Sequence, residues 1–132
     1  MTAFELVHVV LAANGGSTHV VPLDAPDHDP VDLPEGAVVS VTLVFRVMED
    51  LDGLAFETSR RADGGVVAES RTTLGGYRAG GPYEVVLPAE RLPVGHASLG
   101  TYEVTGRFVD GDGREHAREL HRFRIVPQTA KV

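Results

Sequence analysis

Apolar and polar residues alternate with a period of two along much of this chain. The clearest case is the segment Val38–Val47, one face of which is wholly apolar and consists of Val39, Val41, Leu43, Phe45 and Val47. The other face includes Ser40, Thr42 and Arg46. Successive side chains of a β-strand point to opposite faces, so this pattern predicts a strand with one buried and one exposed face.

Turn-forming residues divide the chain into short segments that are rich in Val, Thr, Phe and Tyr. The sequence contains 15 Gly and 8 Pro, a density typical of antiparallel sandwiches and barrels. The predicted strands are Phe4–Ala12, Val20–Leu23, Val38–Val47, Leu54–Arg61, Val66–Thr72, Tyr83–Leu87, Thr101–Val109 and Glu115–Val126. We predict a surface loop at Asp24–Pro34 and hairpin turns at Ala62–Gly65 and Asp110–Gly113. About eight strands, each with one apolar face, predict an all-β sandwich of two sheets.

Length and composition indicate one globular domain over residues 1–132. The hydrophobic fraction of 42% and the charged fraction of 23% are those of a folded chain rather than a disordered one. The sequence has no cysteine, which excludes a disulfide framework, a thiolate zinc site and a cysteine nucleophile. This absence favours a reducing compartment.

The charge balance and the first residues indicate partners and location. A formal net charge of −7 repels the phosphate backbone, so we expect no nucleic-acid partner. Residues 1–11 have no positive charge ahead of an apolar run, and they include Glu5 and His8, so no signal peptide is predicted. No apolar run reaches the length of about 18 residues that a membrane-spanning helix needs. We therefore expect a cytoplasmic protein without stable membrane insertion.

Signatures of enzymes and metal sites are weak or absent in the sequence. It contains no G-x-S-x-G, H-E-x-x-H, P-loop or dinucleotide-binding motif. Asp110–Gly113 resembles the start of a calcium loop, but the twelfth position is His121 instead of the required Glu. A second candidate metal set has no fixed ligand spacing and consists of His19, Asp24, Asp27, His28, Asp29 and Asp32. We therefore expect a protein that is not an enzyme and that uses no cofactor or metal.

The last predicted hairpin brings polar residues onto the apparent core face. If it closes around Asp110–Gly113, the expected pairs are Val109 with Arg114, Gly106 with Ala117, Val104 with Glu119 and Tyr102 with His121. Tyr102, Glu119 and His121 then form a polar cluster at the mouth of a cleft, and a buried Glu119 would need His121 as its partner. The remaining predicted cleft residues are apolar: Leu43, Phe45, Val85, Leu87, Val104 and Phe123. The alternative is that both polar groups reach solvent at the strand ends.

The outer face of the same hairpin is rich in basic residues, which are Arg107, His116, Arg118, Arg122 and Arg124. One interpretation is a docking strip for an acidic protein surface or an anionic lipid. The other is a solvated face on which Glu103 pairs diagonally with Arg118 or Arg122.

Three stretches, taken in order, resemble the carboxy-terminal domain of the Rho GDP-dissociation inhibitor family. The first is Leu33–Gly36 followed by the strand end Val44–Val47, and the second is Gly75–Tyr77 followed by Pro82–Glu84. The third and most specific consists of Leu92–Gly95, Leu99–Tyr102 and Arg107–Asp110. Their order and spacing match the family from about Phe4 to Val126.

The resemblance implies an immunoglobulin-like sandwich of about seven to nine antiparallel strands, in which the family holds an isoprenyl chain between the two sheets. It implies that the ligand is either a lipidated partner protein, which in the family is a small GTPase, or a free lipid. Family members also carry an amino-terminal arm that blocks nucleotide release, and we expect no counterpart here, because the first strand is predicted at Phe4. Where the family places bulky aromatic residues along the cleft, this sequence places Glu119 and His121.

The leading hypothesis is thus a non-catalytic binding domain for an apolar group. The alternative is a protein-interaction or scaffold domain with a solid core and no ligand cavity.

Overall fold

The computed structural model describes residues 3–14, 17–23 and 29–128. Within these residues the chain forms ten strands and one short 3-10 helix: β1 (Phe4–Ala13), β2 (Ser17–Val20), β3 (Val31–Pro34), β4 (Val38–Val47), β5 (Leu51–Ala62), β6 (Gly65–Tyr77), β7 (Gly80–Val86), β8 (Glu90–Arg91), η1 (His96–Ser98), β9 (Gly100–Val109) and β10 (Glu115–Val126). None of the described residues belongs to a helix that is long and apolar enough to span a membrane.

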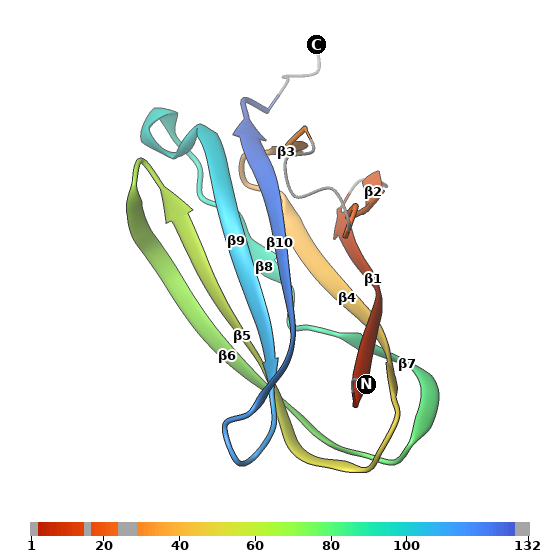
Figure 1. The fold of residues 1–132 in the computed structure, drawn as a ribbon. Helices are drawn as coiled ribbons and strands as arrows, with labels where there is room; N and C mark the ends of the chain where they lie inside the picture. Colours follow the sequence, from red (N-terminus) through yellow and green to blue (C-terminus); the bar gives the residue numbers. More distant parts are fainter. Residues whose placement is uncertain (1–2, 15–16, 24–28, 129–132) are drawn as a thin grey trace.

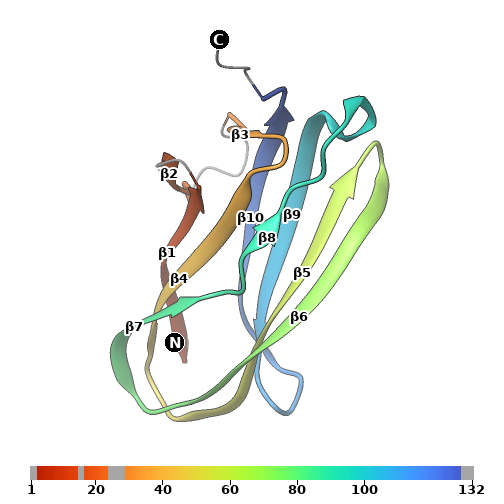
Figure 2. The same cartoon turned by 180° about the vertical axis from the view of Figure 1, so that it is seen from behind.

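The strands form two sheets that pack face to face, seen from opposite sides in Figures 1 and 2. In the first sheet the order is β2-β1-β4-β7, and β8 also pairs with β4. In the second sheet the order is β3-β10-β9-β5-β6, so that β6 is an edge strand. Neighbouring strands are antiparallel except for β3 and β10, which are parallel. The predicted all-β sandwich is confirmed.

The alternating face of β4 supplies the centre of the core, as predicted from its period of two. Leu43, Phe45 and Val47 are almost completely buried. The Phe45 ring lies 5.1 Å from that of Phe4, and the Phe4 ring lies 4.7 Å from that of Phe108 in the other sheet. Each such ring pair adds about 0.5–1.5 kcal/mol to the stabilisation from burial alone. These aromatic residues hold the two sheets together.

The segment predicted as a loop contains a strand. Val31–Pro34 forms β3, which pairs in parallel with the end of β10 and places Leu33 beside Ile125. A four-residue strand that includes a proline and an aspartate has no recognisable alternation, and only its distant partner makes it a strand. Asp24, Asp27 and His28 lie outside the described residues.

The predicted register of the last hairpin is wrong by two residues. Glu119 lies opposite Gly106 and His121 lies opposite Val104. One residue of the difference arises because Arg114 belongs to the turn, where its backbone N–H donates to the Asp110 carboxylate. The other arises from a β-bulge between Glu115 and Ala117. A slip of one residue would turn every side chain to the opposite face, whereas a slip of two keeps the predicted inward face.

Candidate functional site

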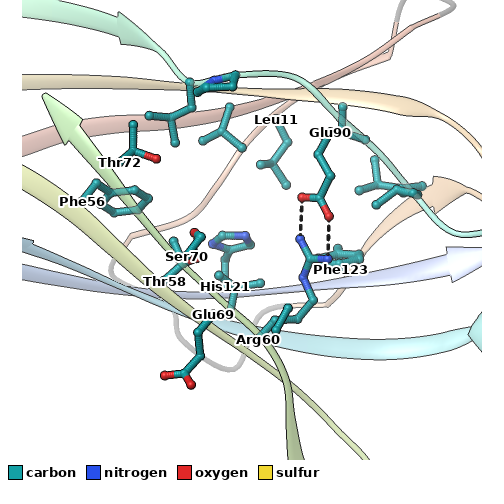
Figure 3. A pocket seen from close by; sticks show the side chains of 18 of the residues that line it. Leu11, Phe56, Thr58, Arg60, Glu69, Ser70, Thr72, Glu90, His121 and Phe123 are labelled. Carbon is teal, nitrogen blue, oxygen red and sulfur yellow. Dashed lines mark hydrogen bonds and ion pairs between the residues drawn. The ribbon is translucent and has the colours of Figure 1, made fainter.

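A cavity of about 360 Å³ lies between the two sheets (Figure 3). Its volume is within the range of roughly 300–1,000 Å³ that is typical of ligand sites. The hydrophobic core is divided into two clusters, and the cavity is bordered by members of both, among them Leu11 and Phe56 from one and Leu33 and Phe123 from the other. The interior is therefore not filled solid.

The two walls of the cavity differ in chemistry. The wall from the first sheet and its connections is mostly apolar and includes Leu11, Val39, Val41, Leu87, Pro88 and Leu92. The wall from the second sheet is largely polar and includes Thr58, Arg60, Ser70, Thr72, Glu119 and His121. A molecule in the cavity would therefore meet hydrocarbon on one side and hydrogen-bonding groups on the other.

The polar wall contains a buried pair of ionisable side chains on β10. Glu119 is 4% exposed and His121 is 5% exposed, so neither is a solvated group at a strand end. The His121 Nδ1 atom lies 3.1 Å from Oε1 and 2.9 Å from Oε2 of Glu119. The expected pairing of the two residues is thus present, because both lie on the inward face of one strand.

A glycine on the neighbouring strand makes room for this pair. A Cβ atom at Gly106 would lie 2.6 Å from Cζ of Phe56 and 2.8 Å from Oε1 of Glu119. Both distances are far below a normal contact, so any side chain at this position would displace the ring or the carboxylate. The absence of a side chain at Gly106 therefore positions the carboxylate that holds His121.

The second ring nitrogen of His121 is available to a ligand. The ring points into the cavity in Figure 3, and Nε2 makes no hydrogen bond to any residue that the structure describes. The imidazole is thus held at Nδ1 by Glu119, while its ring lines the cavity.

Tyr102 does not join Glu119 and His121, contrary to the expectation from the predicted register. It lies opposite Phe123, on which its ring stacks at 5.2 Å. Its hydroxyl donates to the backbone carbonyl of Ser98. Tyr102 thus supports the Phe123 ring and contributes no group to the cavity.

The other predicted cleft residues divide into two groups. Leu87, Val104 and Phe123 line the cavity together with Glu119 and His121. Leu43 and Phe45 lie in the filled part of the core, and Val85 packs against that same core cluster. The β5–β6 wall of the cavity was not predicted from the sequence. The alternation along β5 could have indicated it, because residues 58 and 60 lie on the same face of the strand as Phe56.

An ion pair joins the two sheets at the cavity. The Arg60 guanidinium on β5 donates two hydrogen bonds of 2.9 Å to the Glu90 carboxylate on β8 (Figure 3). The guanidinium carbon also lies 5.2 Å from the centre of the Phe123 ring, a distance typical of cation–π contacts. Ser70 and Glu90 on this border are exposed, so the cavity opens between the β6 edge and β8.

The basic residues on the outer face of the last hairpin have acidic neighbours. Arg107 contacts Glu57 and Glu115, and Arg118 also contacts Glu115. The hydrogen bond from Arg107 is the main cause that lowers the pKa of Glu57, and a second hydrogen bond, from Arg71, acts in the same direction. On the same face Arg124 binds Asp32 and Arg122 lies opposite Glu103. This arrangement favours the interpretation as a solvated, charge-balanced face.

The histidines and acidic residues of the described part of the chain form no group of three or more that could hold a metal ion. In the hairpin turn that resembles a calcium loop, the Asp110 carboxylate is already hydrogen-bonded within the hairpin. The Asp110 carboxylate accepts from the backbone N–H groups of Asp112 and Arg114 and bonds to Nε2 of His116.

Comparisons with known proteins agree on one family. A profile of the family described as RHO protein GDP dissociation inhibitor matches residues 3–128. The Rho GDP-dissociation inhibitor of Schizosaccharomyces pombe (strain 972 / ATCC 24843) is 31% identical over 96 residues, which cover 71% of this chain and 47% of the relative. The chain thus spans about half the length of that relative.

A solved structure shows the same fold at a much lower sequence identity. The crystal structure of the C-terminal domain of wzt matches with a TM-score of 0.65 and 11% identity, over 98% of this chain and 77% of the other. At this identity the likeness concerns the fold alone.

Proposed function

The chain belongs to the Rho GDP-dissociation inhibitor family, and on that premise we propose that it binds a lipid chain in the cavity between its sheets. By family membership, the expected partner is a small GTPase that carries the lipid as a covalent group. A free lipid of the same chemistry is the alternative ligand. The domain acts by binding alone, and its place of action is the cytoplasm, where a lipid group needs shielding from water.

The observation that carries this proposal is the cavity itself. It lies between the two sheets, and its wall on the first sheet consists mostly of aliphatic side chains such as Val39, Val41 and Leu87. Transfer of an apolar chain from water into such a site contributes about 0.8 kcal/mol per methylene group. The alternative from the sequence, a scaffold domain with a solid core, would not contain a cavity of this kind.

A cavity-filling substitution tests the proposal. Ala68 lines the cavity from the edge strand β6, whereas its neighbour Val67 is 55% exposed and does not line it. Affinity is measured by titration of the protein into a fluorescently labelled farnesyl-cysteine. We expect Ala68→Phe to weaken binding by about tenfold or more, because the new ring occupies ligand volume.

Val67→Phe is the matched control, since it places the same ring on the same strand outside the cavity. It should bind the probe as the wild type does. Equal affinities of the two variants, or no binding by the wild type, would contradict lipid binding in this cavity. A pull-down with a prenylated and an unprenylated Rho-type GTPase then tests whether a protein presents the lipid.

A further inference from the structure

The buried pair on β10 makes the cavity bind a ligand that is hydrocarbon throughout less tightly than a ligand with a polar group beside His121. His121 is 5% exposed and lines the cavity, and of its two ring nitrogens Nδ1 is bonded to Glu119, which leaves Nε2 for a ligand. A polar atom that is buried against hydrocarbon loses its bond to water and gains nothing in return. A ligand with a hydrogen-bonding group at this point avoids that loss.

The tautomer of His121 defines which group fits. Since Nδ1 donates to the Glu119 carboxylate, Nε2 is an acceptor when the ring is neutral and a donor when it is protonated. A hydroxyl group both accepts and donates, so it satisfies Nε2 in either state. An ether or carbonyl oxygen fits only the protonated ring.

The residues around His121 also favour a ligand that carries oxygen on one side. Thr58 and Ser70 line the same wall, and their hydroxyl groups are hydrogen-bonded to each other. The opposite wall offers only aliphatic groups over Leu11, Val41 and Leu87. The cavity is therefore complementary to a chain that is apolar along one side and carries oxygen on the other.

We propose that the cavity selects an apolar chain that bears a hydroxyl group, which hydrogen-bonds to Nε2 of His121. The proposal rests on lipid binding in the cavity and narrows the class of lipid from a plain hydrocarbon chain to an oxygenated one. His121 determines this specificity, and Glu119 is the residue that positions it. The hydroxyl-bearing chain is the same ligand whether it arrives as a free lipid alcohol or attached to a partner.

Two probes that differ in one group test the specificity. The probes are dodecan-1-ol and tridecane, in which a methyl group replaces the hydroxyl. Each is delivered from cyclodextrin, and its affinity is measured by how well it displaces the fluorescent farnesyl probe. We expect the wild type to bind the alcohol about tenfold more tightly than the alkane. Equal binding of both compounds overturns the proposal and leaves lipid binding intact. Displacement by neither compound also overturns the proposal, whereas lipid binding is decided by the farnesyl probe and the Ala68→Phe variant.

The double variant Glu119→Leu/His121→Phe locates the effect. It removes both members of the pair, so no buried charge is left without a partner. We expect it to retain the alkane and to lose the preference for the alcohol. A preference that persists in the folded double variant shows that another group recognises the hydroxyl and overturns the role of His121.

A second measurement covers the case in which the double variant does not fold. In the ¹⁵N-labelled wild type, dodecan-1-ol should shift the Nε2 resonance of one buried histidine, whereas tridecane should not. Identical responses to the two compounds contradict a hydrogen bond at Nε2.

Discussion

Nδ1 of His121 lies 2.9 Å from Oε2 of Glu119, and a single residue separates the two along β10. Neighbours at this spacing project on the same side of a strand, about 7 Å apart at their backbones. Their side chains therefore meet only by bending toward each other, and they do so inside the protein. The arrangement makes each residue dependent on the other, and the first prediction concerns that dependence.

Loss of one member of the pair should destabilise the fold more than loss of both. His121→Phe leaves the Glu119 carboxylate buried without its donor, which we expect to cost roughly 3–5 kcal/mol of unfolding free energy. Glu119→Leu/His121→Phe should cost much less. Urea denaturation of the three proteins at pH 7 measures the difference. If the double variant is as unstable as the single one, the pair does not act as a unit.

Gly106→Ala should destabilise the fold because the new methyl group collides with Phe56 and Glu119. Overpacking of this kind costs roughly 1–3 kcal/mol. Gly65→Ala is the matched control, since a Cβ at that position meets nothing within 4 Å. Thermal melts of both variants compare the two sites. A Gly106→Ala protein as stable as the control would mean that Phe56 can move away freely.

Glu57 should make the fold sensitive to acid. The hydrogen bonds from Arg107 and Arg71 lower its pKa from the usual value of 4.5, so the folded state holds the carboxylate charged more strongly than the unfolded state does. The stabilisation is complete above pH 4.5 and disappears as the pH falls through the lowered pKa. Urea midpoints of the wild type and Glu57→Gln should therefore differ at pH 6, and the difference should shrink progressively as the pH falls below 4.5. A difference that stays constant over this range would contradict the linkage.

The ion pair between Arg60 and Glu90 should slow the exchange of ligand. It connects β5 and β8 where the cavity opens, so its removal lets β5, with its edge neighbour β6, separate from β8 more easily. We expect Glu90→Gln to increase the dissociation rate of the farnesyl probe severalfold while the unfolding free energy changes by less than about 1 kcal/mol. Stopped-flow displacement measures the rate. Glu5→Gln, which removes a different ion pair, with Arg46, should leave it unchanged.

Alternation along the chain was sufficient to predict the longer strands and the inward face of β4, but not β3, β8 or the position of β2. It also predicted that Glu119 and His121 share the inward face of the strand. This prediction is correct although the predicted register was wrong, because an error of two residues preserves which face each side chain occupies. The same error removed Tyr102 from the cluster, because partners across a hairpin depend on the turn and on a bulge that no pattern in the sequence indicates.

Two parts of the structure could not be predicted from local pattern. The polar wall on β5 and β6 consists of residues such as Thr58, which is half-buried, and Ser70, which is exposed, so their polarity in the sequence indicates an ordinary surface and not a cavity wall. β3 exists only through its pairing with β10, about ninety residues away. Both features depend on contacts between distant segments.

The crowding around Gly106 has a consequence for how relatives of this protein can diverge. Phe56, Gly106 and Glu119 come from three strands and compete for one small volume. A lineage that acquires a side chain at position 106 must give up the acid at 119 or shrink the ring at 56. Substitutions at these three sites should therefore occur together among the relatives of this protein.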